Sequence, residues 1–194
     1  MARLDSDLEQ RIAMSRPGDT VRGLSFSAVL ALVERKQGLE AAERLRGLLF
    51  SRPPVDFFSY PVVDFLRLLY GTAETLRAHY ASRDEALRAC GDAIAKGFFE
   101  SAVGQTLLRL IQGTDPKRIY CNAPAAYSTS VSYGERDYQP LGERKIRLHF
   151  RGDMLPLPVH EGILAAALAA LGREGRVVGT ALGLAEFDFV IEWT

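Results

Sequence analysis

The residues best suited to chemistry in this 194-residue chain are its histidines, His79, His149 and His160. None has another His or a Cys at ligand spacing, so we expect no metal site. His160 precedes Glu161 at the start of an expected helix, and such a pair can transfer protons. A hydrolase or isomerase using His160 and Glu161 is therefore one alternative function. The competing interpretation is that His160 is a partly exposed residue of the first helical turn.

Motifs that carry catalysis elsewhere do not occur. The sequence contains no nucleophile elbow, phosphate-binding loop, dinucleotide fingerprint, zinc-protease motif or C-x-x-C pair. We therefore expect no catalytic residue, no cofactor and no enzymatic activity.

Basic side chains gather on one face of an expected strand over residues 145–151. Lys145, Arg147 and Arg151 alternate with apolar residues and could bind an anion or an acidic partner. A nucleic-acid-associated regulator using the basic strand 144–151 is thus a second alternative. However, 24 basic residues balance 24 acidic ones, whereas phosphate binding favours a basic surplus. Asp188 and Glu192 could also neutralise this face across the sheet.

Cysteine usage and hydropathy bear on the compartment. Cys90 lies at an apolar helical position and Cys121 in an expected strand, so we interpret both as buried free thiols of a reducing cytoplasm. The N-terminal residues lack the apolar core of a secretory signal. The longest Ala/Leu-rich run, residues 163–171, is too short to cross a bilayer. We expect a cytoplasmic protein without a membrane span.

Helical periodicity dominates the first half of the chain. It predicts helices over residues 26–38, 39–50, 60–78 and 83–111, the last one ending at Gly113 or breaking near Gly97. Ser82 and Glu85 form a capping box at its start. The helix over 60–78 is apolar on most sides, and we interpret its face as a dimer surface. On that interpretation, Leu69→Asp would dissociate the dimer without unfolding the monomer.

Strand patterns follow in the second half. We predict strands over 118–123 and 127–133, a polar connection over 134–142 and a strand over 145–151. A helix over 159–171 with Gly172 as its stop and a hairpin of 176–182 with 186–193 complete the chain. This order predicts an α+β fold. We expect a polar N-terminal segment, 1–18, and a single domain, 19–194.

An ordered series of short motifs runs through most of the chain from about residue 20. It comprises Arg22-Gly23-Leu24-Ser25-Phe26, Tyr60-Pro61, Phe99-Glu100-Ser101, Gly113-Thr114-Asp115-Pro116, Tyr133-Gly134-Glu135-Arg136, Phe150-Arg151-Gly152-Asp153, His160-Glu161-Gly162 and the terminal 187–193. In this series the chain resembles a paralogous family of unknown function found mainly in myxobacteria.

More distantly, the layout is similar to the superfamily of 4-vinyl-reductase domains, haem-NO-binding domains and TRAPP subunits. This resemblance implies N-terminal helices packed on one side of a C-terminal antiparallel sheet with one inserted helix. It also implies frequent dimers and a pocket between helices and sheet. The Tyr-x-Ser-x-Arg motif that holds haem propionates has no counterpart in residues 127–131, and helix 83–111 has no histidine. We therefore expect no haem.

These observations favour a non-enzymatic cytoplasmic module that forms a homodimer and binds a small apolar ligand or a protein partner in signalling or regulation. Six residues facing the sheet are the candidate ligand-binding set: Phe65, Leu69, Ile94, Phe98, Tyr127 and Tyr133. Lys145, Arg147 and Arg151 are the candidate anion or partner surface.

Overall fold

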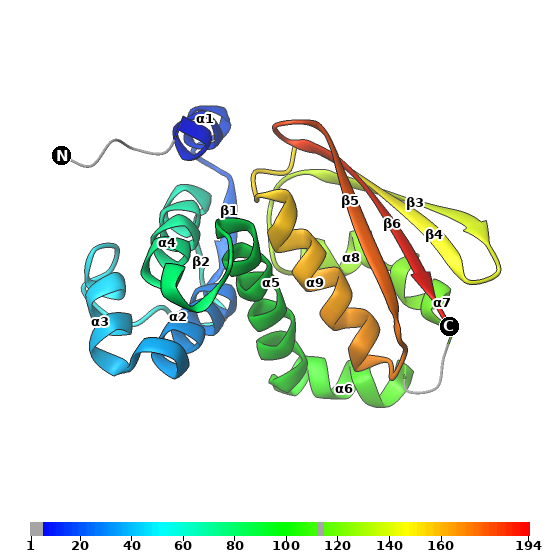
Figure 1. The fold of residues 1–194 in the computed structure, drawn as a ribbon, viewed down its shortest axis with the longest axis horizontal. Coiled ribbons are helices and arrows are strands. Elements are labelled where there is room, and N and C mark those ends of the chain that lie inside the picture. Colours follow the sequence, from blue (N-terminus) through cyan, green and yellow to red (C-terminus); the bar gives the residue numbers. More distant parts are fainter. Residues whose placement is uncertain (1–5, 112–114) are drawn as a thin grey trace.

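The fold is an α+β arrangement in a computed structural model that describes residues 6–111 and 115–194. A helical unit and a four-stranded antiparallel sheet lie on opposite sides of a central helix, α5 (Figure 1). The predicted fold class is confirmed. The predicted helix end at Gly113 and the first five residues of the expected N-terminal segment lie outside the described residues.

The helical unit comprises α1 (Ser6–Met14), α2 (Gly23–Gln37), α3 (Leu39–Gly47), α4 (Val62–Thr75) and the short 3-10 helix η1 (Arg77–His79). Strands β1 (Thr20–Arg22) and β2 (Ser59–Pro61) pair antiparallel beside it. The interpretation of α4 as a dimer surface is wrong, because Phe65, Leu66, Leu68 and Leu69 are 0% exposed within one chain. Leu69→Asp would place a charge in this core, so we now expect it to unfold the protein.

The predicted long helix is two helices, α5 (Arg83–Glu100) and α6 (Ala102–Ile111). Ser82 caps α5 by accepting a hydrogen bond from the Glu85 N–H, as the capping box predicts. The break falls at Ser101, where the side-chain oxygen accepts from the Gly104 N–H and so begins a new helix.

Two predicted strands are helices instead. Residues 118–123 and 127–133 fall on α7 (Pro116–Tyr120), α8 (Ala123–Ser128) and the turn after it. The Asp115 side chain accepts from the Lys117 N–H and Pro116 occupies the first turn, two features that begin a helix. After α8, the N–H groups of Ser130 and Val131 both reach the Tyr127 carbonyl. Residues 129–133 therefore form a turn with an isolated β-bridge from Val131 to Val21, and no strand.

The sheet has the order β3-β4-β6-β5, formed by β3 (Glu135–Gly142), β4 (Lys145–Arg151), β5 (Gly175–Gly183) and β6 (Glu186–Trp193). The predicted strand 145–151 and the hairpin of β5 with β6 are confirmed. The predicted polar connection 134–142 is wrong, because β3 pairs with β4 along the sheet edge. The buried position of β3 is an arginine, Arg136, and Pro140 near its end is exposed, so β3 carries no apolar alternation.

Helix α9 (Leu157–Ala170) covers the apolar face of the sheet and packs along α5 (Figure 1). Its predicted stop is confirmed, since Gly172 adopts φ +68° directly after the helix. At the crossing of α5 and α9, a Cβ on Gly91 would lie 1.9 Å from the Val159 oxygen, and one on Gly162 would lie 2.0 Å from the Arg88 oxygen. The two main chains therefore touch at this crossing.

Two apolar clusters result. The first fills the helical unit and the adjoining side of α5, and the second lies between the sheet and helices α7, α8 and α9. Tyr127 packs against both clusters. The site described below lies where they meet.

Candidate functional site

An apolar pocket lies between α5, the α7–α8 region and α9. Its volume is about 140 Å³. It is lined by Ala95, Phe98, Phe99, Ile119, Tyr120, Ala123, Ala126, Tyr127, Ser130, Ile163, Leu164 and Ala167. The walls bring together residues that are far apart in the sequence. They consist almost entirely of aliphatic and aromatic groups, which suits an apolar guest.

The candidate ligand-binding residues separate into two groups. Phe98 and Tyr127 line this pocket. Phe65 and Leu69 are fully buried in the first cluster, where Tyr133 also lies at 8% exposure, and Ile94 packs against that cluster. Helical spacing placed α4 and α5 residues on apolar faces, but it did not distinguish the helical core from the pocket wall.

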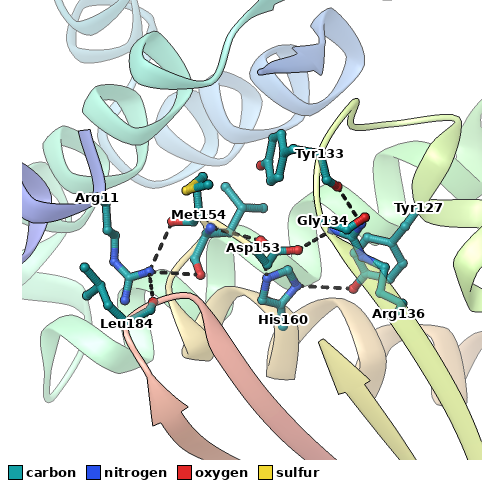
Figure 2. Close-up of polar contacts among 10 residues, drawn as sticks. Arg11, Tyr127, Tyr133, Gly134, Arg136, Asp153, Met154, His160 and Leu184 are labelled. Carbon is teal, nitrogen blue, oxygen red and sulfur yellow. Dashed lines mark hydrogen bonds and ion pairs between the residues drawn. The ribbon is translucent and has the colours of Figure 1, made fainter. Parts of the chain in front are cut away.

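A buried polar cluster adjoins the pocket through Tyr127, and we define it as Arg136, Asp153, His160 and Tyr127 (Figure 2). Asp153 and His160 are both 0% exposed, so the interpretation of His160 as partly exposed is wrong. The His160 Nε2 atom lies 3.0 Å from Oδ1 of Asp153, within ion-pair distance but outside hydrogen-bond geometry. The Tyr127 hydroxyl lies 3.3 Å from Nδ1 of the same imidazole.

Arg136 completes the polar cluster from the edge strand β3. Its guanidinium pairs with the Asp153 carboxylate and donates to the Tyr133 carbonyl at 2.7 Å. It also lies 4.6 Å from the centre of the Tyr127 ring, a cation–π arrangement. Backbone carbonyls, a carboxylate and an aromatic face thus surround a cation that would otherwise be costly to bury.

The electrostatic balance favours the ionised form of Asp153. Burial raises the pKa of this carboxyl, but the attraction of His160, Arg136 and the Leu155 N–H together outweigh burial and lower the pKa below its ordinary value. The Leu155 N–H donates to Oδ1 at 3.0 Å. Burial also raises the pKa of Tyr127 and Tyr133 well above the ordinary value, so both phenols keep their protons.

A second buried cation ties α1 to this region. Arg11 donates through Nη1 to the carbonyls of Met154, Leu155 and Leu184 at 3.1, 3.3 and 2.9 Å (Figure 2). Its Nε also lies 3.2 Å from the Tyr70 hydroxyl on α4. A single side chain therefore joins α4, the segment before α9 and the β5–β6 turn.

Glu161, the partner of His160 in the enzyme alternative, is used elsewhere. Its carboxylate pairs with Arg88 on α5 and accepts the Gly179 N–H at 2.9 Å. These contacts connect α9 to α5 and to β5. His160 and Glu161 therefore point to different partners and do not converge on a common site.

The basic strand residues all have acidic neighbours. Lys145 lies 3.5 Å from Glu192, and Arg147 lies 3.8 Å from Asp188. Arg151 contacts Glu135 and Asp137 on β3 at 3.1 and 2.9 Å. The expected partial neutralisation across the sheet is present, and it extends to β3.

Arg11, Arg136 and Asp153 were not singled out as site residues in the sequence. Two of them lie in short motifs with glycine, Tyr133-Gly134-Glu135-Arg136 and Phe150-Arg151-Gly152-Asp153, and His160 lies in a third. In the first two motifs, the charged residue follows within two positions a glycine with positive φ, Gly134 or Gly152. No such motif surrounds Arg11.

Residues 14–194 match the profile of a family described as "Protein of unknown function (DUF2378)". The chain belongs to the DUF2378 family. A search of curated proteins found no match for this DUF2378 protein.

Solved structures of H-NOX proteins share its fold. One from K. algicida, in the Fe(II) unliganded form, is 14% identical with a TM-score of 0.68, over 89% of this chain and 96% of that chain. One from S. oneidensis, in the Fe(II)NO ligation state, is 15% identical with a TM-score of 0.64, over 89% and 99%. An oxygen-binding H-NOX domain related to soluble guanylate cyclases is 10% identical with a TM-score of 0.68, over 89% and 95%.

The residues of the DUF2378 protein do not fit a haem. The pocket has the volume of a cavity that holds one benzene ring, which is too small for a macrocycle of four pyrroles. The imidazole of His160 is enclosed between Asp153 and Tyr127. Among residues 6–111 and 115–194, no group of three or more His, Cys, Asp and Glu residues could hold a metal ion. The same part of the chain has no helix that is long and apolar enough to cross a membrane.

Proposed function

We propose that the protein is a non-enzymatic binding module for a small apolar ligand that acts in signalling or regulation. The observation that carries this proposal is the apolar pocket between α5, α7–α8 and α9. The α9 residues of the pocket wall lie on the same helix as His160. The α5 residues of the wall include Phe98 and Phe99. An occupant would therefore contact both helices that connect the helical unit to the sheet.

The volume of the pocket indicates the size of the ligand. An engineered cavity of about 150 Å³ in another protein binds benzene. A pocket of about 140 Å³ therefore suits a single ring or a short branched aliphatic molecule. Burial of such a molecule would be favoured by roughly 25 cal/mol for each Å² of apolar surface removed from water.

A titration of the protein with methylcyclohexane, followed by NMR, tests the proposal. Ala167 lines the pocket on α9, whereas Ala169 lies on the exposed side of the same helix. We expect Ala167→Leu to fill the pocket and abolish binding, and Ala169→Leu to leave it unchanged. Equal binding by both variants would place the ligand elsewhere, and no binding by the unaltered protein would contradict the proposal.

The absence of enzymatic activity is part of the proposal. It is supported by the enclosed position of His160 and by the contacts of Glu161 with Arg88 and the Gly179 N–H. Screening of hydrolase and isomerase substrates tests it, since turnover that His160→Ala abolishes would restore the enzyme alternative. We also propose that the protein does not bind nucleic acid, because acidic residues of β3 and β6 pair with the basic residues of β4. Steeply salt-dependent DNA binding would contradict this.

A homodimer in the cytoplasm is also proposed. Self-association is supported by zero net charge and by the adjacent rings of Phe57 and Phe58, which are 72% and 55% exposed. Sedimentation would show a dimer that a Phe57→Ser, Phe58→Ser double variant weakens, and a monomer at all concentrations would contradict it.

The proposed cytoplasmic location is supported by the free thiols at Cys90 and Cys121, which suit a reducing compartment.

A further inference from the structure

The segment between α3 and β2 presents Phe57 to solvent on a main chain that is fixed by hydrogen bonds. The Phe57 ring is 72% exposed and packs only edge-on against the ring of Phe58. The Phe57 carbonyl accepts from Nη1 of Arg22 at 2.8 Å, and the Phe58 carbonyl accepts the N–H of Gly23, the first residue of α2, at 2.8 Å. An aromatic side chain on an ordered backbone is a favourable anchor, because little conformational freedom is lost when a partner buries it.

The apolar pocket is reachable from the surface and has the size of such a ring. Among its lining residues, Ala126 is exposed and Phe98 and Ser130 are half-buried. Its volume of about 140 Å³ matches a cavity that holds one benzene molecule. The pocket can therefore receive one phenyl ring from outside.

Arg22 connects the Phe57 segment to the edge of this pocket. Its N–H donates to the carbonyl of Ser130, a lining residue, at 2.9 Å. Its Nε donates to the Thr129 carbonyl at 3.3 Å, while Nη1 reaches the Phe57 carbonyl. The ring and the pocket thus belong to adjoining parts of one surface, yet within one molecule the ring stays exposed. Two copies related by a twofold axis can each insert a ring into the other, since such an interface is self-complementary.

We propose that the pocket of one molecule receives the Phe57 ring of a second copy, and that a small apolar ligand competes with this ring and separates the two copies. This inference rests on the proposed function and adds the partner of the pocket and the response to the ligand. The balance of 24 basic and 24 acidic residues leaves no net repulsion between copies. A ligand that occupies only the free pocket shifts the association equilibrium towards the monomer by mass action.

Two variants separate the ring from the pocket. Phe57→Ser removes the ring and keeps the pocket, whereas Ala167→Leu fills the pocket and keeps the ring. The matched controls are Leu48→Ser, which removes another apolar side chain that is 80% exposed, and Ala169→Leu on the exposed side of α9. In sedimentation equilibrium, we expect each of the first two variants to raise the dimer dissociation constant at least about tenfold, the value of burying one ring. Both controls should leave it unchanged.

A mixture of the two variants tests whether the ring enters the pocket. Phe57→Ser still has an open pocket and Ala167→Leu still has its ring, so a heterodimer keeps one of the two insertions. Native mass spectrometry, which resolves the two masses, should show the heterodimer in excess of a statistical mixture. An exposed ring that is merely adhesive gives no such excess, and its absence would overturn the inference.

Methylcyclohexane tests the competition between ligand and ring. It should shift the sedimentation of the unaltered protein towards the monomer, and Phe57→Ser should bind it in an NMR titration at least as tightly as the unaltered protein does. Binding without dissociation of the dimer, or an unaltered protein that is monomeric at all concentrations, would overturn the inference and leave ligand binding intact. Failure of both proteins to bind methylcyclohexane would instead contradict the proposed function, and the heterodimer would still show whether the ring enters the pocket.

Discussion

Asp153 is a carboxylate without solvent exposure whose ionised form is held by Arg136, His160 and the Leu155 N–H. Two of these neighbours lie on different elements, Arg136 on β3 and His160 on α9. The charge therefore contributes to the position of both elements. Loss of the charge leaves the Arg136 cation buried without its counterion, which is strongly destabilising in proteins.

The pKa of Asp153 predicts a loss of stability in acid. Because the folded state lowers this pKa below the ordinary value of 3.8, the unfolded chain takes up the proton first as pH falls. The contribution of Asp153 is complete above its ordinary pKa and disappears as pH falls through the folded-state pKa. We expect the free energy of unfolding in urea to decline below about pH 4, and less steeply in Asp153→Asn. Identical pH dependence in the two proteins would contradict this assignment.

The two thiols are predicted to react differently. Cys90 is 0% exposed and burial raises its pKa to about 12, so it has almost no thiolate at neutral pH. The expectation that Cys121 is also buried is wrong, because the residue follows α7 on the surface. A thiol reagent should therefore label Cys121 in the native protein and Cys90 only in denaturant. Peptide mass spectrometry reads out the sites, and native labelling of Cys90 would contradict its burial.

At the scale of elements, the crossing of α5 and α9 leaves no space for a side chain at Gly91 or Gly162. We expect Gly162→Ala to destabilise the protein by about 1–3 kcal/mol or more, because its Cβ would lie 2.0 Å from the Arg88 carbonyl oxygen. Gly47→Ala is the control, since it meets nothing within 4 Å at the end of α3. Its stability should stay equal or rise by up to about 1 kcal/mol. Urea unfolding measures both, and a neutral Gly162→Ala would show that the helices can separate.

Elements with strong local signals could be predicted from the sequence. The capping box before α5, the apolar alternation of β4 and the glycine after α9 each have a local physical cause, and each appears as expected. The predicted strand over 127–133 is wrong because the alternation of Tyr, Thr and Val with Ser resembles a half-buried strand, and the predicted strand over 118–123 is wrong as well. Only the Asp115 cap, Pro116 and Pro124 indicated helices there.

The candidate site was less predictable than the fold. Phe98 and Tyr127 are 29 positions apart, and only the tertiary fold brings them to one pocket. Asp153 and Arg136 lie in segments without apolar periodicity, and each is buried against the opposite charge of the other. Such mutual dependence leaves no local pattern in the sequence.

At the scale of the whole molecule, α1 joins the helical unit to the sheet through Arg11. We expect Arg11→Ala to lower the free energy of unfolding by about 2–3 kcal/mol, since three carbonyls lose a charged donor. Hydrogen exchange should show faster exchange in α1. Arg44→Ala is the control, because its side chain is 70% exposed and its pair with Glu40 contributes less than about 1 kcal/mol. Similar losses in both variants would contradict the role of Arg11.

The direct contact of main chains at Gly91 and Gly162 has a mechanical consequence. Side chains between helices can change rotamer and so absorb a small shift, but two touching backbones can only slide or move together. Helix α9 forms one wall of the pocket and α5 forms another, on the far side of which lies the helical unit. A guest that pushes α9 sideways must therefore either slide it along α5 or displace α5 with it. Where the two helices move together, a small change of volume in the pocket is passed to the helical unit that packs on α5.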